Sequence, residues 1–257
     1  MLKSTLLKAT QAGAKVLKEY FNGTFTISYK DTINNLVTEA DKKAEAAIIA
    51  AIHEDYPDHH ILSEEIGELK QGSSIKWIID PIDGTVNFAH GIPLCCVSIG
   101  VEQDGEMILG AVYNPIMNEL FFAQKGFGAT LNDKLIHVSQ KKSVANACLV
   151  TGFPYEWENS VNNPMNVLER FVKLGLPVRR LGSAAIDLCW VACGRFDGFW
   201  EHSLNAWDSA AGYLIVQEAG GKVTDFKGNA YSPYQKQILA TNGHIHTDLL
   251  KEINSPQ

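Results

Sequence analysis

Hydrophobic residues recur at helical spacing in two segments near the start of the chain. Over residues 1–21 they repeat every three or four positions and leave lysines on the other side. Over residues 38–55 alanines and isoleucines share one face, and Pro57 follows directly. The pattern predicts two amphipathic helices, with a short alternating strand at residues 25–29 between them.

From residue 60 to residue 139 the apolar runs are short and are separated by turn residues, which is typical of strands. The turns are marked by Asp104-Gly105, Asn114-Pro115 and Asn132-Asp133. Strands are predicted at 60–63, 76–80, 96–101, 107–113, 120–123 and 128–131. This first part of the chain is therefore expected to be α+β and rich in antiparallel pairs.

After residue 140 predicted strands and helices alternate. Strands are predicted at 148–151, 178–181, 196–200, 222–226 and 238–241, and helices at 164–174, 183–193, 207–219 and 246–253. Alternation of this kind is typical of α/β folds. We expect an N-terminal α+β half over residues 1–140 and a C-terminal α/β half over residues 141–257, packed as one body with a shared cleft.

Composition excludes several classes of protein. The 257 residues are 46% hydrophobic and 20% charged, so the chain is not intrinsically disordered. The first 21 residues lack the unbroken apolar run of a signal peptide. The sequence also has no stretch of about 18 apolar residues, the length needed to cross a membrane. The five cysteines include no Cys-x-x-Cys pair. Cys189 and Cys193 could form half of a zinc site, although buried reduced thiols are the favoured interpretation. A cytoplasmic protein is expected.

The net charge of −7 lies entirely in the first half. Residues 1–140 hold 11 Lys, no Arg and 18 acidic residues, whereas residues 141–257 hold 7 Lys, 4 Arg and 11 acidic residues and are neutral. A chain this acidic is a poor non-specific binder of nucleic acid or of anionic membranes. The uneven charge requires another explanation.

The segment Asp80-Pro-Ile-Asp83-Gly84-Thr85 follows an apolar strand and carries the most distinctive chemistry. Two carboxylates at a strand end are expected to project into one place. The glycine permits close backbone approach, and free N–H groups with the threonine hydroxyl suit a phosphate. The alternative is a simple turn, because Asp-Gly is a common turn dipeptide.

Three other acidic positions could join this site. Glu64 and Glu65 follow a short apolar strand, Asp208 begins an apolar helix, and Asp41 lies in the first turn of the second helix. Each has a purely structural alternative: Thr38 and Asp41 fit a capping box, Asp208 could be an N-cap, and Glu64 could lie on the surface.

In combination, the segments VTEAD, SEE, DPIDGTVNF and WDSAAGYLIVQEAGG resemble the inositol monophosphatase family of Mg²⁺-dependent, lithium-sensitive phosphatases, over residues 35–242. The resemblance implies a layered α/β/α/β/α sandwich of the inositol monophosphatase and fructose-1,6-bisphosphatase type. It also implies a homodimer, because many relatives are dimers. It implies two or three Mg²⁺ ions and a water that attacks the phosphate without a phosphoenzyme. The implied metal ligands are Glu64, Asp80, the Ile82 carbonyl, Asp83 and Asp208.

Further roles follow from the same resemblance. Asp41 and Glu65 neighbour the metal ligands, Thr85 orients the attacking water together with Glu64, and residues 83–85 hold the phosphate. The implied contacts with the alcohol are Gly182, Ser183, Ala184 and Glu201, with Asp208 at the leaving oxygen. Oxygen ligands of this kind suit Mg²⁺ rather than zinc.

Some features depart from the family pattern or stay open. Ser63 stands where the family usually has glycine, residues 154–160 match no pattern, and Arg179 and Arg180 could serve an oligomer interface or a second phosphate. His202 is expected at the surface or behind the site. Val86 and Asn87 differ from the charged residue typical of the 3′-phosphoadenosine nucleotidase branch.

The expected reaction is hydrolysis of a phosphorylated polyol or sugar, with inositol 1-phosphate as the leading substrate. Histidinol phosphate and fructose 1,6-bisphosphate are alternatives with the same metal chemistry. An aspartyl-phosphate mechanism is disfavoured, because it would leave Glu64 and Asp208 without a role. An alternative of another class is a regulatory partner of the transcription machinery, as the resemblance to some bacterial relatives implies.

Overall fold

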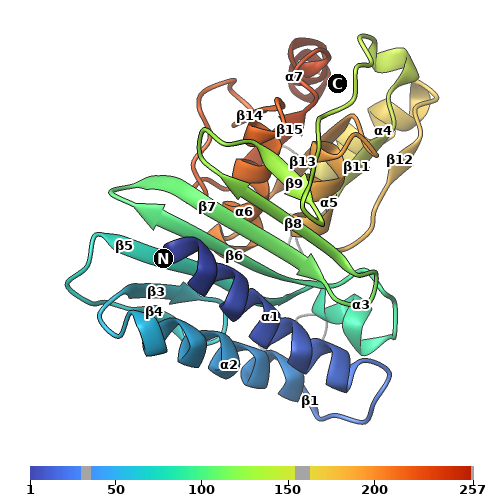
Figure 1. The fold of residues 1–257 in the computed structure, drawn as a ribbon. Helices are drawn as coiled ribbons and strands as arrows, with labels where there is room; N and C mark the ends of the chain where they lie inside the picture. The colour runs from blue at the N-terminus through green and yellow to red at the C-terminus, as the bar shows by residue number, and fades with distance from the viewer. Residues whose placement is uncertain (30–35, 154–162, 256–257) are drawn as a thin grey trace.

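The strands of the protein form two large sheets and one small ribbon in a computed structural model that describes residues 1–29, 36–153 and 163–255 (Figure 1). The ribbon pairs β1 (Ile27–Tyr29) with β2 (Leu36–Thr38). The eight-stranded sheet has the order β10-β9-β8-β7-β6-β5-β3-β4 and consists of β3 (His60–Ser63), β4 (Gly67–Leu69), β5 (Ile75–Asp83), β6 (Cys96–Gln103), β7 (Glu106–Asn114), β8 (Glu119–Gln124), β9 (Ala129–Leu131) and β10 (Lys134–Leu135). The five-stranded sheet has the order β12-β11-β13-β15-β14 and consists of β11 (Leu149–Thr151), β12 (Val178–Arg179), β13 (Gly198–His202), β14 (Lys222–Thr224) and β15 (Gln237–Thr241).

Helices cover both sheets and separate them. The longer helices are α1 (Leu2–Tyr20), α2 (Glu39–Asp55), α4 (Pro164–Lys173), α5 (Ala184–Ala192), α6 (Ala206–Glu218) and α7 (His246–Asn254), and α3 (Thr85–Ala89) is a single short turn. In Figure 1, α1 and α2 lie on one face of the large sheet, α5 and α6 lie between the two sheets, and α4 and α7 lie beyond the smaller sheet. The layered α/β/α/β/α architecture expected from the resemblance is confirmed.

The continuous apolar run of β5 reflects burial on both faces. Trp77 and Ile79 point toward the core beneath α1 and α2, whereas Ile78 points toward the core around α5 and α6. Successive side chains of a strand alternate between faces, so a strand covered on both sides is apolar throughout. This double burial brings the end of β5 into the middle of the molecule.

Most predicted elements are present, with one informative error at Pro81. The predicted strand ended at Asp80, but β5 runs through Pro81 to Asp83 and pairs Asp83 with Cys96 after a shift of register. Proline cannot donate a hydrogen bond to the ladder, and the irregularity absorbs this loss without ending the strand. The short elements β4, β10 and α3 were not predicted, and β12 is shorter than the strand expected at 178–181.

Three further expectations concern the cysteines, the membrane and the division of the chain. All five cysteines are free thiols, and Cys189 is buried. Among the described residues no helix is long and apolar enough to cross a membrane. The eight-stranded sheet lies within residues 1–140 and the five-stranded sheet within residues 141–257, yet one core cluster draws on both. The division into two halves stays a prediction.

Candidate active site

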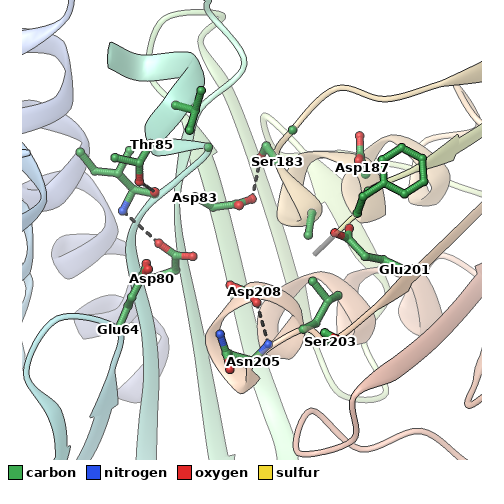
Figure 2. Close-up of a pocket in the computed structure, with 18 of the residues that line it drawn as sticks. Glu64, Asp80, Asp83, Thr85, Ser183, Asp187, Glu201, Ser203, Asn205 and Asp208 are labelled. Atoms are coloured by element: carbon green, nitrogen blue, oxygen red, sulfur yellow. Dashed lines mark hydrogen bonds between the residues drawn. The ribbon is translucent and has the colours of Figure 1, made fainter. Parts of the chain in front are cut away.

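A pocket of about 280 Å³ lies between the end of β5 and the end of β13, at the N-terminal ends of α5 and α6 (Figure 2). Every site residue predicted from the sequence lines it, except Asp41 and Glu65. Its lining consists of Leu36, Glu64, Asp80, Ile82, Asp83, Gly84, Thr85, Val86, Gly152, Phe153, Arg180, Gly182, Ser183, Ala184, Asp187, Glu201, His202, Ser203, Leu204, Asn205 and Asp208. Residues 154–160, which matched no pattern, lie outside the described residues.

The turn after β5 brings the two halves of the pocket into contact. Gly84 adopts a left-handed conformation with φ of 88° immediately before α3. A Cβ atom at this position would lie 2.7 Å from the Leu94 carbonyl oxygen and 3.3 Å from Ser183 Cβ. Only glycine fits both the conformation and the space, so the turn lies directly against the start of α5.

Asp83 connects this turn to α5 across 100 residues of sequence. Its Oδ2 accepts hydrogen bonds from Ser183 Oγ at 2.5 Å and from the backbone N–H of Ala185 at 2.7 Å. Ser183 also caps α5 by accepting from Ile186 N–H. The resemblance assigned Asp83 to the metal and Ser183 to the alcohol, and the bond between them lay beyond what the sequence predicted.

Asp41 combines the structural and the functional interpretation. Its Oδ2 completes the capping box of α2 by accepting from Thr38 N–H at 2.7 Å and from Thr38 Oγ1 at 2.6 Å. Its Oδ1 lies 3.2 Å from Thr85 Oγ1, which is also 2.9 Å from the Ile82 carbonyl oxygen. Asp41 is buried behind the pocket and holds Thr85 in position at its edge.

Asp208 reaches the pocket from the first turn of α6. The suggestion that Asp208 is an N-cap is wrong. Asn205 is the N-cap of α6, and Asp208 is the N3 residue that completes the capping box. Its Oδ2 accepts from Asn205 N–H at 2.7 Å. This bond orients the carboxylate toward the same pocket as Asp80 and Asp83 (Figure 2).

Glu64 lies on a loop that a second residue of α2 supports. Glu45 is 3% exposed, and its Oε1 accepts hydrogen bonds from Ser63 Oγ and from the backbone N–H groups of Glu65 and Ile66. Sequence reasoning missed Glu45. The available signal was its position four residues after Asp41, which places both on one face of the helix.

The carboxylates of the pocket raise one another's pKa. Burial is the largest cause and raises the pKa of Asp80 and Asp208 well above the usual range, with the charges of Glu64 and Asp83 adding to it. Burial also raises the pKa of Asp83 to about 6 and that of Asp41 to about 7, against the lowering effect of their hydrogen bonds. Clustered carboxylates of this kind require positive charge between them.

The donors fit a hard cation in chemistry. Carboxylate and carbonyl oxygens are the ligands that Mg²⁺ prefers. Within the described residues, however, no three acidic, histidine or cysteine side chains are arranged closely enough to hold an ion as they stand. An ion would therefore have to draw the carboxylates together, which like charges resist in its absence.

The opposite end of the pocket carries Glu201 and Asp187. Glu201 lies at the end of β13 and is 9% exposed, and Asp187 on α5 is 1% exposed. Asp187 was not predicted, although it follows Ser183 by one helical turn. Arg179 and Arg180 are both exposed; Arg180 lines the pocket, whereas Arg179 donates to the Val178 carbonyl of its own strand.

His202 is buried and is one of the pocket-lining residues, so of the two expected positions the one at the surface is wrong. It is 3% exposed and meets the ring of Phe226 edge-on at 4.6 Å. Burial lowers its pKa to about 4, which keeps the ring neutral near pH 7. Its position on β13, directly after Glu201, turns it to the other face of the strand.

The family profile of the inositol monophosphatases matches residues 2–257. The chain belongs to the inositol monophosphatase family. It is 48% identical over 224 residues to an inositol-1-monophosphatase of Synechocystis, covering 87% of this chain and 78% of that one. It is 41% identical over 254 residues to the Nus factor SuhB of Pasteurella multocida, covering 98% and 95%.

A solved structure gives the same answer for the fold. The crystal structure of the extragenic suppressor protein suhB from Bartonella henselae superposes with a TM-score of 0.93 at 36% identity, over 100% of this chain and 99% of that chain. The inositol monophosphatase family consists of metal-dependent phosphatases, and this member is a phosphatase enzyme.

Proposed function

We propose that this inositol monophosphatase family member hydrolyses inositol 1-phosphate to inositol and phosphate with Mg²⁺, without a phosphoenzyme. The observation that carries the proposal is the distribution of acidic side chains between the two ends of the pocket. Asp80, Asp83 and Asp208 gather at one end, and Glu201 lies at the other beside the start of α5. The similarity to the Synechocystis inositol-1-monophosphatase supports the same substrate.

Two or three Mg²⁺ ions are the proposed cofactors. The residues that would hold them are Glu64, Asp80, the Ile82 carbonyl, Asp83 and Asp208, with Glu65 beside them. When bound, such ions supply the positive charge that stabilises a transferring phosphoryl group and acidifies water. Buried carboxylates with raised pKa values support this assignment, because a cation offsets both their burial and their repulsion.

Thr85 and Glu64 are the proposed positioning groups for the attacking water. The Thr85 hydroxyl lies near two acceptors, Asp41 Oδ1 and the Ile82 carbonyl, so its single proton is directed away from the pocket. A lone pair then remains to accept a hydrogen bond from water. The backbone N–H groups at Gly84 and Thr85 are proposed to hold the phosphate, in line with that water.

The alcohol is proposed to bind at the other end of the pocket. Gly182, Ser183 and Ala184 line this end, and Glu201 is positioned to accept hydrogen bonds from hydroxyl groups. Asp83 and Asp208 are proposed to lie near the oxygen that leaves. Histidinol phosphate and fructose 1,6-bisphosphate remain alternative substrates, because they require the same metal chemistry.

A phosphate-release panel tests the proposal. It covers inositol 1-phosphate, histidinol phosphate, fructose 1,6-bisphosphate, 3′-phosphoadenosine-5′-phosphate and glycerol phosphates, with Mg²⁺ and with or without Li⁺. We expect release to be greatest from inositol 1-phosphate and to be inhibited by Li⁺. Asp83→Asn should abolish turnover and keep the fold, because asparagine can still accept from Ser183 and Ala185. Absence of release from every ester, or an active Asp83→Asn enzyme in metal-replete buffer, would refute the proposal.

A second function is suggested by relatives of similar identity that are named Nus factor SuhB. For this chain it would be binding to the transcription machinery. A pulldown with RNA polymerase compares the wild type with Asp83→Asn. Equal capture of both proteins would support a role that needs no turnover, and no capture of either would exclude it.

A cytoplasmic homodimer also stays a prediction. Light scattering measures the mass of the assembly and so tests the dimer.

A further inference from the structure

A pair of acidic side chains, Asp187 and Glu201, lines the pocket at the end away from Glu64 and Asp80 (Figure 2). Both are buried, at 1% and 9% exposure. The carboxyl group of Asp187 accepts no hydrogen bond from any described residue, and its Oδ1 is completely shielded from solvent. Asp187 is therefore a pocket-lining acid without a partner.

Buried polar atoms without a hydrogen bond are rare in folded proteins, and each requires an explanation. Asp197 in the same half is a useful contrast. It is equally buried, but it accepts hydrogen bonds from Ser139 Oγ at 2.5 Å, Lys141 Nζ at 3.0 Å and Cys148 N–H at 2.6 Å. The protein thus satisfies a buried carboxylate where its role is structural, and leaves Asp187 unsatisfied beside the pocket.

The surroundings of Asp187 point to donors supplied by a ligand. Burial raises the pKa of Asp187 well above the usual range, the charge of Glu201 raises it further, and only Arg180 opposes this. The charge of Arg180 lowers the pKa of both carboxyl groups, but in the described part of the chain no ion pair within 4.0 Å joins Arg180 to either of them. An anion is therefore a poor occupant of this end, whereas a neutral hydroxyl group can donate to a carboxyl oxygen at little electrostatic cost.

The backbone fixes the geometry of the pair. A Cβ atom on Gly152 would lie 2.2 Å from both carboxylate oxygens of Glu201, so that carboxylate lies directly over the end of β11. Ser183, the N-cap of α5, donates to Asp83, and Asp187 follows it by one helical turn toward Glu201. Helix α5 thus extends from the contact with Asp83 toward Glu201 and places Asp187 at a fixed offset from the proposed phosphate position, while β13 carries Glu201.

We propose that Asp187 and Glu201 together accept hydrogen bonds from two hydroxyl groups of the substrate's alcohol, and that Asp187 makes the enzyme selective for phosphate esters of polyols. This inference rests on the proposed phosphatase function and adds a residue that determines which alcohol is accepted. An ester whose alcohol has no further hydroxyl group leaves the pair unsatisfied and gains nothing from it.

The test compares inositol 1-phosphate with phenyl phosphate, which has no hydroxyl group on its ring. For Asp187→Ala we expect the ratio of the two kcat/KM values to fall by about 10- to 100-fold, because a buried hydroxyl group of the substrate loses its hydrogen-bond acceptor. Asp187→Asn retains one acceptor oxygen and should fall by roughly 3- to 10-fold. The loss should appear mainly in KM for inositol 1-phosphate.

Asp197→Asn is the matched control, because it alters an equally buried carboxylate that does not line the pocket. It should lower both rates in the same proportion and leave the ratio intact. An unchanged ratio in both Asp187 variants, with or without a general loss of rate, would overturn the inference and assign Asp187 a structural role.

A failure of the proposed function is distinguishable from a failure of this inference. If the wild type hydrolyses neither ester, the phosphatase proposal for these substrates is wrong, and calorimetric titration with the same two esters replaces the kinetic ratio. Weaker binding of inositol 1-phosphate alone in Asp187→Ala supports the polyol contact. Equal weakening for both esters, or none, overturns it.

Discussion

At the scale of single residues, many buried polar groups are paired within the fold, and several buried acidic groups line the pocket. His246 is an example of the first kind. It is 1% exposed, and its Nε2 and Nδ1 each lie 2.9 Å from a threonine hydroxyl, those of Thr224 and Thr241. These bonds connect α7 to β14 and β15. Such a histidine stabilises the fold only while its ring stays neutral.

His246 makes stability depend on pH. Burial lowers its pKa to about 4, with the charge of Lys222 adding to the effect, whereas an unfolded histidine titrates near about 6.5. Between these values the unfolded chain binds the proton first, so stability is lost as pH falls from about 6.5 to 4. In His246→Gln the loss between pH 7 and pH 4.5 should be smaller by about 1–2 kcal/mol, measured by urea unfolding.

His244→Gln is the control for this experiment. His244 is exposed and lies two residues away, so its replacement should leave the pH dependence as in the wild type. If the unfolding free energy of His246→Gln falls with pH as steeply as that of the wild type, other groups cause the acid instability.

The site residues differ in how far sequence could predict them. Asp80 and Asp83 are recognisable because the whole motif lies within six residues. The contact of Asp83 with Ser183 joins positions 100 residues apart, and that of Glu45 with Glu65 joins positions 20 apart. Such contacts depend on which elements become neighbours, and local periodicity contains no information on this. Asp187 was missed for the same reason.

At the scale of elements, helix α2 supports both residues proposed to position the attacking water. Asp41 and Glu45 are one turn apart on its buried face. Asp41 contacts Thr85, and Glu45 holds the loop that carries Glu64. Ser63, where the family usually has glycine, adds its hydroxyl to this contact. One rigid helix therefore sets the relative position of two separate segments.

Removal of Glu45 should weaken the proposed metal site and the fold together. Glu45→Ala leaves the N–H groups of Glu65 and Ile66 without their acceptor, which costs about 1–3 kcal/mol of unfolding free energy. If Glu64 binds the metal as proposed, loss of this support should raise the Mg²⁺ concentration for half-maximal activity by about 10-fold. Calorimetric titration with Mg²⁺ and urea unfolding measure the two effects.

Two further variants make this experiment specific. Glu45→Gln keeps a carbonyl acceptor and should retain most of the Mg²⁺ affinity. Glu54→Ala alters an exposed glutamate of the same helix, which pairs with Lys8 at the surface, and should change neither quantity measurably. Unchanged Mg²⁺ affinity in Glu45→Ala would limit Glu45 to a purely structural role.

The elements themselves were largely predictable, and their errors have a local cause. Long periodic segments such as α1, α2 and α6 follow directly from the spacing of apolar residues. Pro81 led to the wrong end for β5, because the rule that proline ends a strand ignores the irregularity that accommodates it. Strands β4 and β10 have only three and two residues, too few for a pattern to emerge.

At the scale of the whole molecule, the pocket explains part of the uneven charge. Asp41, Glu64, Asp80 and Asp83 belong to the acidic first half of the chain, and Asp208 joins them from the neutral second half. Two or three Mg²⁺ ions would add about four to six positive charges at this place. The net charge of −7 is therefore a poor guide to the ligand, and a phosphate ester need not be repelled.

The same clustering predicts that Mg²⁺ stabilises the wild type much more than it stabilises Asp80→Asn. In the wild type, Mg²⁺ at 100 times its dissociation constant should stabilise the fold by about 2.7 kcal/mol, a rise in Tm of roughly 5–10 °C. Asp80→Asn keeps the hydrogen bond from Ile82 N–H but removes one charge from the cluster. Without metal it should be more stable than the wild type by about 1 kcal/mol, because repulsion is relieved, and it should lose most of the stabilisation by Mg²⁺.

Asp197→Asn is the control, because the Asp197 carboxylate is already paired with Lys141. This variant should be less stable than the wild type, and the loss should be the same with and without metal. Thermal unfolding in EDTA and in Mg²⁺ separates the three proteins. An Asp80→Asn protein that is destabilised in EDTA and still gains the full wild-type increment from Mg²⁺ would show that Asp80 neither repels its neighbours nor binds the ion.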